Sequence, residues 1–149
     1  MRLTSYTDYS LRILIYLGLC GPEELSTIEQ ISGAYGISAN HLMKVVNRLG
    51  KLGYVETVRG RGGGLRLGLP PVEINIGQVV RQMEPDLAMV ECFDREKGRC
   101  AIKPACRLKS VLEKALDGFL DVLDDYTLAD LLINPAPLRE LVHLAATPL

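Results

Sequence analysis

The chain has 149 residues, of which 48% are hydrophobic and 23% charged, with a formal net charge of −1, as is typical of a globular protein with one domain or a small domain and an extension. The longest apolar stretch, Leu11 to Cys20, is too short to span a bilayer and contains Arg12, and no signal-peptide pattern precedes it. These features exclude a transmembrane protein, and we expect a soluble, cytoplasmic one.

A first helix is expected near the N-terminus. Apolar residues recur at helical spacing after Thr7 or Asp8, either of which can cap the helix. The helix should end near Gly18 or Gly21, before a loop that Pro22 opens.

A second helix is expected from the capping-box sequence Ser26-Thr27-Ile28-Glu29. In this pattern the hydroxyl and the carboxylate three residues later satisfy each other's free backbone amides. The helix should run to about Tyr35, and Gly36 should end it.

A third helix should begin with Ser38 as its N-cap and run to about Leu52. The short turn that joins it to the second helix is typical of a helix-turn-helix motif, whose second helix can lie in the DNA major groove. Its apolar stripe consists of Leu42, Val45, Val46 and Leu49. The opposite face presents side chains that can donate to phosphates and base edges, namely Asn40, His41, Lys44, Asn47 and Lys51.

Two short strands are expected at residues 54–58 and 65–68, around a basic, glycine-rich tip, and this is the pattern of a winged helix-turn-helix. The tip suits phosphates or the minor groove better than it suits a nucleotide, since it lacks a Gly-Lys-Ser/Thr signature and no helix begins directly after it. We therefore predict DNA contacts at Ser38, Asn40, His41, Lys44, Asn47, Arg59, Arg61, Gly62 and Gly63.

The charge is distributed unevenly along the chain. Residues 38–68 contain six Lys or Arg and one Glu, a net charge of six minus one, or +5. Residues 82–149 contain twelve acids and eight bases, a net charge of −4. A polyanionic partner should therefore bind the first half, although a solvated helix face rich in lysine would give the same count.

Asn75 should cap a helix from Ile76 to about Glu84, which Pro85 ends. The longest helix should lie after Pro104, because apolar residues repeat there at intervals of three and four over about twenty residues. So broad a stripe is expected to pair with a second copy of the chain, with packing inside one chain as the alternative.

The expected fold class is mainly α with a small β-hairpin wing. A winged helix-turn-helix domain would span residues 1–84, and a cysteine loop residues 85–106. A dimerisation helix and a short capped helix would occupy residues 107–133, and a weakly ordered tail residues 134–149.

The cysteine loop contains Cys92, Cys100 and Cys106, whereas the rest of the chain has only Cys20. Thiolates bind soft metals and iron–sulfur clusters, so cysteines this close in a cytosolic protein indicate metal or redox chemistry before they indicate a disulfide. Three ligands leave a tetrahedral or cuboidal centre one ligand short. Cys20 lies among apolar residues and is left out of the site.

Four segments together resemble the winged-helix iron–sulfur regulators that include IscR, RirA and NsrR. They are residues 1–12, the wing at 58–67, the cysteine loop, and Tyr126-Thr-Leu-Ala-Asp-Leu131. The resemblance covers roughly residues 1–133. Within the family, Asp8 and the segment Pro104-Ala-Cys-Arg-Leu-Lys109 are most similar to the nitric-oxide-sensing members.

This resemblance implies a homodimeric DNA-binding repressor in which Cys92, Cys100 and Cys106 hold an iron–sulfur cluster near the dimer interface, [4Fe-4S] in preference to [2Fe-2S]. It implies that the partner subunit's Asp8 supplies an oxygen ligand, a harder and weaker one than thiolate. Arg12, one turn after Asp8, would hold that carboxylate or screen the cluster's charge. Nitric oxide would nitrosylate the cluster, release operator DNA and derepress detoxification genes.

Three alternatives stay open. The first is an iron-responsive regulator, because the seven residues between Cys92 and Cys100 also suit the iron-responsive members. Lys109 stands where the IscR-like members place a histidine, which argues against that subgroup. An electron-transfer enzyme is a second alternative, although the sequence has no paired acid–base constellation or cofactor fingerprint. A structural zinc module is the third.

Overall fold

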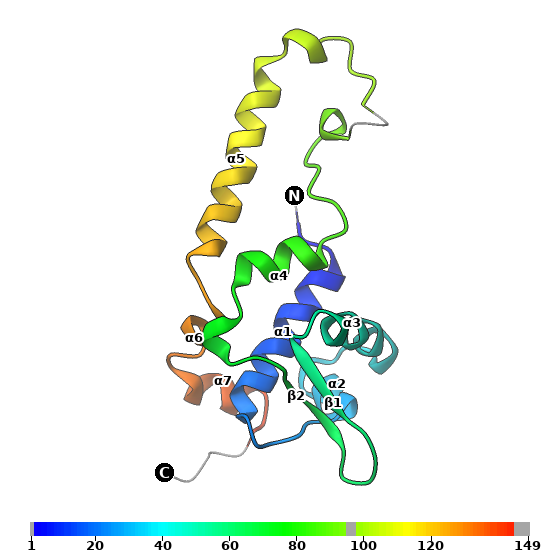
Figure 1. The fold of residues 1–149 in the computed structure, drawn as a ribbon, viewed down its shortest axis with the longest axis vertical. Coiled ribbons are helices and arrows are strands. Elements are labelled where there is room, and N and C mark those ends of the chain that lie inside the picture. Colours follow the sequence, from blue (N-terminus) through cyan, green and yellow to red (C-terminus); the bar gives the residue numbers. More distant parts are fainter. Residues whose placement is uncertain (1, 95–97, 145–149) are drawn as a thin grey trace.

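The computed structural model describes residues 2–94 and 98–144 (Figure 1). The helices are α1 (Ser5–Cys20), α2 (Ile28–Tyr35), α3 (Ala39–Lys51), α4 (Ile76–Met83), α5 (Arg107–Asp124), α6 (Leu128–Leu131) and α7 (Pro135–Leu141). The strands β1 (Val55–Val58) and β2 (Gly64–Leu67) form one antiparallel hairpin. Short 3-10 turns lie at Pro71–Glu73, Glu91–Phe93 and Lys103–Ala105. The predicted fold class, mainly helical with a hairpin wing, is confirmed.

The N-cap of α1 is Thr4, so the prediction of Thr7 or Asp8 is wrong. The Thr4 side chain accepts a hydrogen bond from the Thr7 backbone N–H at 3.4 Å. Thr7 itself is fully buried inside the first turn. Because this turn buries a threonine and not a hydrophobic residue, the apolar pattern places the helix start one turn late. The predicted end near Gly21 is confirmed.

The capping box of α2 is also shifted by one residue. Thr27 and Gln30 form it, with hydrogen bonds of 2.8 and 3.2 Å, in place of the predicted Ser26 and Glu29. Ser26 is instead buried, and its backbone exchanges two hydrogen bonds with Leu65 of β2, at 2.9 and 2.7 Å. A partner distant in sequence therefore removes Ser26 from the cap.

The core is built from the apolar faces of α1, α3 and α4. The predicted stripe of α3 is buried, and so are Ile76, Val79, Val80 and Met83 of α4. Asn75 caps α4 as predicted, its side chain accepting from the Gln78 backbone N–H at 3.0 Å. Ser38 is the N-cap residue of α3, as predicted, but its side chain makes no capping hydrogen bond.

The longest helix, α5, extends away from this body together with the cysteine loop (Figure 1). Its C-terminal end is fixed to α4, where Arg81 donates to the Asp124 carboxylate at 2.5 and 2.7 Å. The Asn75 side-chain amide donates to the Asp124 backbone carbonyl at 2.7 Å. The base of α5 is therefore held on the winged domain. No helix among the described residues is long and apolar enough to cross a membrane.

The prediction of a weakly ordered tail is wrong over Pro135–Leu141, which forms α7. Arg139 of this helix donates a hydrogen bond to the backbone carbonyl of Leu19 in α1. Val142 and Leu144 pack against the hydrophobic core. Three prolines suggest a tail locally, but Pro135 stands in the first turn of the helix, where its missing N–H costs nothing. Residues 145–149 of the predicted tail lie outside the described residues.

The segment after α5 belongs to the core through Leu128. This residue is 0% exposed, and its backbone N–H donates to the Ile74 carbonyl at 2.8 Å. We expect Leu128→Ala to lower the free energy of unfolding by about 2–5 kcal/mol, since it leaves a cavity beside α1. Leu131→Ala, at a side chain that is 39% exposed, is the control and should cost less than about 1 kcal/mol. Urea denaturation of both variants checks this, and equal losses would contradict the packing described.

Candidate DNA-binding surface and cysteine loop

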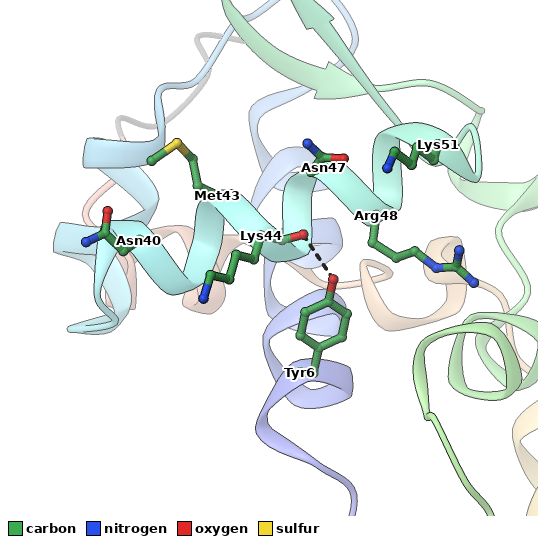
Figure 2. Close-up of a pocket in the computed structure, with 7 residues that line it drawn as sticks. All are labelled: Tyr6, Asn40, Met43, Lys44, Asn47, Arg48 and Lys51. Carbon is green, nitrogen blue, oxygen red and sulfur yellow. Dashed lines mark hydrogen bonds between the residues drawn. The ribbon is translucent and has the colours of Figure 1, made fainter.

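The outer face of α3 lines an open groove of about 660 Å³ (Figure 2). All of the α3 side chains that line it are exposed. The lining residues are Tyr6, Asn40, Met43, Lys44, Asn47, Arg48 and Lys51. The groove thus carries three cationic groups and two amides on one helix, which is the donor set that phosphates and base edges accept from.

Four of the predicted recognition residues, Asn40, Lys44, Asn47 and Lys51, come together in this groove. His41 is exposed on the same helix, with its ring 6.5 Å from that of Tyr9 in α1. Ser38 is exposed at the start of the helix.

Sequence reasoning missed Arg48, Met43 and Tyr6 as groove residues. The helical spacing of Arg48 from Lys44 could have found it, whereas Met43 reads as a core residue although its side chain is 52% exposed. Tyr6 has no local signal, because it comes from α1. Its hydroxyl donates to the Lys44 backbone carbonyl at 3.0 Å, which joins α1 directly to α3 (Figure 2).

The wing places Arg59 and Arg61 on an exposed tip. The hairpin closes with Val58 opposite Gly64, and in the tip Gly60 and Gly62 have φ of 99° and 75°, a region that favours glycine. Below the tip, Arg66 donates to Glu56 across the strands at 2.8 Å, an interaction that lowers the pKa of Glu56. Because the tip is rich in glycine, neighbouring side chains do not keep Arg59 and Arg61 from approaching the backbone of a polyanion such as DNA.

Gly63 is predicted to be essential for the shape of the wing. A Cβ at this position would overlap the backbone carbonyl oxygen of Val58 and lie 2.9 Å from that of Gly60. We expect Gly63→Ala to lower operator affinity about tenfold, because the displaced tip loses phosphate contacts. Gly33→Ala in α2, where a Cβ meets nothing within 4 Å, is the control and should bind like the wild type. Fluorescence anisotropy with labelled DNA measures both.

The three cysteines of the loop are free thiols at distinct places. Cys92 lies in the turn Glu91–Phe93, Cys100 is exposed, and Cys106 is the N-cap residue of α5. Residues 95–97 of the loop lie outside the described residues. Among the described residues, no three His, Cys, Asp or Glu side chains are close enough together to hold a metal ion. The donor set, three accessible thiols in one segment, nevertheless suits an iron–sulfur cluster in its chemistry.

A pocket of about 440 Å³ lies beside Cys92 and is lined by two ammonium groups, those of Lys103 and Lys109, and by two carboxylates, those of Glu113 and Asp117. Lys109 also pairs with Glu113 at 2.8 Å. Lys109 therefore brings a positive charge to this pocket, and the Glu113 carboxylate is paired with it.

Asp8 lies on α1 and is paired with Arg12, with N–O distances of 3.0 and 2.8 Å. Both side chains are 44% exposed, and the hydrogen bond to Asp8 raises the pKa of Arg12. Arg12 also accepts, through its backbone carbonyl, a hydrogen bond of 3.1 Å from the Tyr35 hydroxyl at the end of α2. The Asp8 carboxylate is thus held in one orientation on the helix that contacts the helix-turn-helix motif.

Cys20 is nearly completely buried, and its sulfur lies 3.2 Å from the Ser26 hydroxyl. Burial raises the pKa of the Cys20 thiol, which keeps it neutral. It therefore has neither the exposure nor the ionisation of a metal ligand.

Comparison with known proteins connects this arrangement to a family. The HTH-type transcriptional regulator NsrR of Bacillus subtilis (strain 168) is 58% identical over 144 residues, which cover 97% of this chain and 99% of that protein. NsrR of Shouchella clausii (strain KSM-K16) is 54% identical, over 99% of each chain. The relatives compared are named as transcriptional regulators and not as enzymes.

Solved structures of the same fold agree. T. potens IscR has a TM-score of 0.72 at 27% identity, covering 90% of this chain and 88% of that one. CymR, the global cysteine regulator of B. subtilis, has a TM-score of 0.71 at 28% identity, covering 88% and 95%. The Rrf2 family, described as iron-dependent transcriptional regulators, matches residues 3–134. The resemblance predicted from the sequence is confirmed, and the chain belongs to the Rrf2 family of transcriptional regulators.

Proposed function

We propose that the chain is a cytoplasmic, homodimeric transcriptional repressor that senses nitric oxide through an iron–sulfur cluster. The observation that carries the proposal is the double role of α1. Within three residues this helix contacts the recognition helix through Tyr6 and presents Asp8 as a candidate cluster ligand. The relatives' names, HTH-type transcriptional regulator NsrR, support the role as a DNA-binding regulator.

DNA binding rests on α3 and the wing. The groove residues of α3 would enter the major groove, and Arg59 and Arg61 would reach flanking phosphates or the minor groove. A two-fold dimer would place two such helices in successive major grooves, about 34 Å apart, on a palindromic operator. Arg48, exposed beside Lys44 and Lys51, adds a phosphate donor to the residues predicted from sequence.

Dimerisation is supported by an exposed seam on α5. Most of this helix is solvent-exposed, and Leu120 is its one buried residue among those described. Leu108, Val111 and Val122 are 61%, 60% and 58% exposed, although all three are apolar. Two small residues lie between Val111 and Val122, and the five residues together follow the 3-4-3-4 spacing of a helix-pairing stripe. The seam consists of Leu108, Val111, Ala115, Gly118 and Val122.

The cluster ligands would be Cys92, Cys100 and Cys106 of one subunit and the partner subunit's Asp8. We favour [4Fe-4S] over [2Fe-2S]. When bound, such a cluster supplies iron that reacts with nitric oxide at the position of its weakest, carboxylate ligand. Arg12 competes for the same carboxylate, so an Asp8 released from the cluster can return to the ion pair with Arg12 in its own helix.

The transmission step uses contacts that α1 already makes. A shift of Asp8 moves the first two turns of α1, and Tyr6 carries that shift to α3 through its hydrogen bond to Lys44. Arg12 and Tyr35 connect the same part of α1 to the end of α2. Both helices of the DNA-reading motif therefore respond to the position of one carboxylate.

Iron status is the second candidate signal. The spacing of Cys92 and Cys100 suits iron-responsive members, and the family is described as iron-dependent. A repressor of this kind would release DNA when iron is removed, without any nitric oxide.

The test is a mobility-shift titration of an operator with cluster-containing protein, untreated, treated with nitric oxide, or treated with an iron chelator. We expect nitric oxide to release the operator and the iron chelator alone to leave the complex intact. Unchanged affinity after nitric oxide would refute the proposal, and release by chelator alone would favour iron sensing.

A further inference from the structure

Glu84 lies between the cysteine loop and the N-terminus of α1. It follows the last residue of α4, and its backbone N–H donates to the Val80 carbonyl at 2.9 Å. Its carboxylate accepts hydrogen bonds from the Thr4 backbone N–H, at 3.2 Å to each oxygen, and from the Thr4 hydroxyl at 3.1 Å. It also accepts one from the hydroxyl of Thr7, a fully buried residue. One side chain thus takes three donors from a segment eighty residues earlier.

These bonds hold the turn of α1 that matters for the proposed function. Thr4 is the N-cap, and Thr7 lies between Tyr6, which contacts α3, and Asp8. A carboxylate at a helix N-terminus is favoured by the helix dipole, and hydrogen bonds to an ionised acceptor are stronger than neutral ones. On the other side, Glu84 directly precedes the cysteine loop and is eight residues before Cys92. It is therefore the residue that joins α4 to the loop along the chain.

We propose that Glu84 is a positioning residue that couples the cysteine loop to α1 within one subunit. The inference rests on the proposed function, in which the state of the loop controls the recognition helix. The partner subunit's Asp8 would provide a contact between subunits, and Glu84 provides a second connection inside each chain. The loop and the first turn of α1 therefore move together, and the hydrogen bond from Tyr6 to Lys44 passes that motion to α3.

The first measurement uses the protein without a cluster. Hydrogen–deuterium exchange of residues 4–8 should be faster in Glu84→Gln than in the wild type, since the amide loses the charge and one of the two acceptor oxygens. Asp86→Asn is the matched control. It removes the same charge two residues later, but among the described residues the Asp86 carboxylate accepts only a local hydrogen bond from the Ala88 backbone N–H, at 2.5 Å. Unchanged exchange in Glu84→Gln would overturn the proposal.

The second measurement separates coupling from simple stability. Operator affinity is determined with and without the cluster, and the ratio of the two is compared among variants of equal cluster absorbance. We expect Glu84→Gln and Thr7→Val to reduce this ratio about tenfold, while Thr7→Ser, which keeps the hydroxyl, and Asp86→Asn retain it. The double variant Glu84→Gln with Thr7→Val should show no further loss, because both changes remove the same connection.

The outcomes distinguish the two proposals. If Glu84→Gln and Thr7→Val both kept the wild-type ratio of operator affinities with and without the cluster, the role of Glu84 would be overturned and the proposed function would stand. A wild-type protein that binds DNA equally with and without the cluster would overturn both. Thr7→Val also tests the connection from the other side if Glu84→Gln does not fold.

Discussion

Cys100→Ala is expected to abolish the iron–sulfur absorbance of the protein and to lower operator affinity by at least about 100-fold. Loss of one of the three proposed thiolate ligands would leave too few ligands to hold the centre. Without the cluster, binding falls toward the non-specific level, which is typically weaker by about 10³-fold or more. Absorbance after anaerobic reconstitution and anisotropy with operator DNA measure the two effects.

The control is Cys20→Ala. Cys20 is buried and hydrogen-bonded to Ser26, so this variant should keep the absorbance and the affinity, with a modest loss of stability. If Cys100→Ala kept a full cluster, or if Cys20→Ala lost it, the assigned ligand set would be wrong.

Val111→Asp is expected to convert the dimer to a 16.4 kDa monomer and to lower operator affinity by at least about 100-fold. Val111 lies within the exposed seam of α5, where pairing would bury it, and an aspartate there would become an unpaired charge in an apolar interface. A monomer contacts one half-site and loses the contribution of the second.

Ser110→Asp adds the same charge one residue away, at an exposed position outside the seam. It should remain dimeric and bind DNA normally. Light scattering after size-exclusion chromatography gives the mass of each variant. A Val111→Asp protein that stays dimeric would show that the subunits pair through another surface.

Much of the fold could be predicted because its signals are local. The apolar stripe of α3, the Asn75 cap of α4 and the short capped helix α6 each depend on residues a few positions apart, and the structure has all three. The failures involve distant partners. Ser26 pairs with Leu65 and therefore does not form the predicted cap. The proline-rich end of the chain folds because Arg139 bonds to the Leu19 carbonyl and Leu144 packs against the core.

The residues of the candidate site could likewise be predicted where their signal is local and could not where it depends on distant contacts. Helical periodicity places Asn40, Lys44, Asn47 and Lys51 on one face, and the structure gathers them in one groove. Tyr6 and Glu84 act through contacts across 38 and 80 residues, for which a single sequence carries no signal. The ligand set, including the partner subunit's Asp8, and the division of the chain at residues 84, 106 and 133 stay predictions, since they depend on a second subunit and a bound cluster.

The most direct measurement of the central claim follows two signals in one sample. Nitric oxide is titrated anaerobically into the cluster-containing protein bound to fluorescent operator DNA, while cluster absorbance and DNA anisotropy are recorded together. The account predicts that both signals change over the same range of nitric oxide per cluster. An absorbance change that runs to completion while the anisotropy stays at its bound value would contradict it.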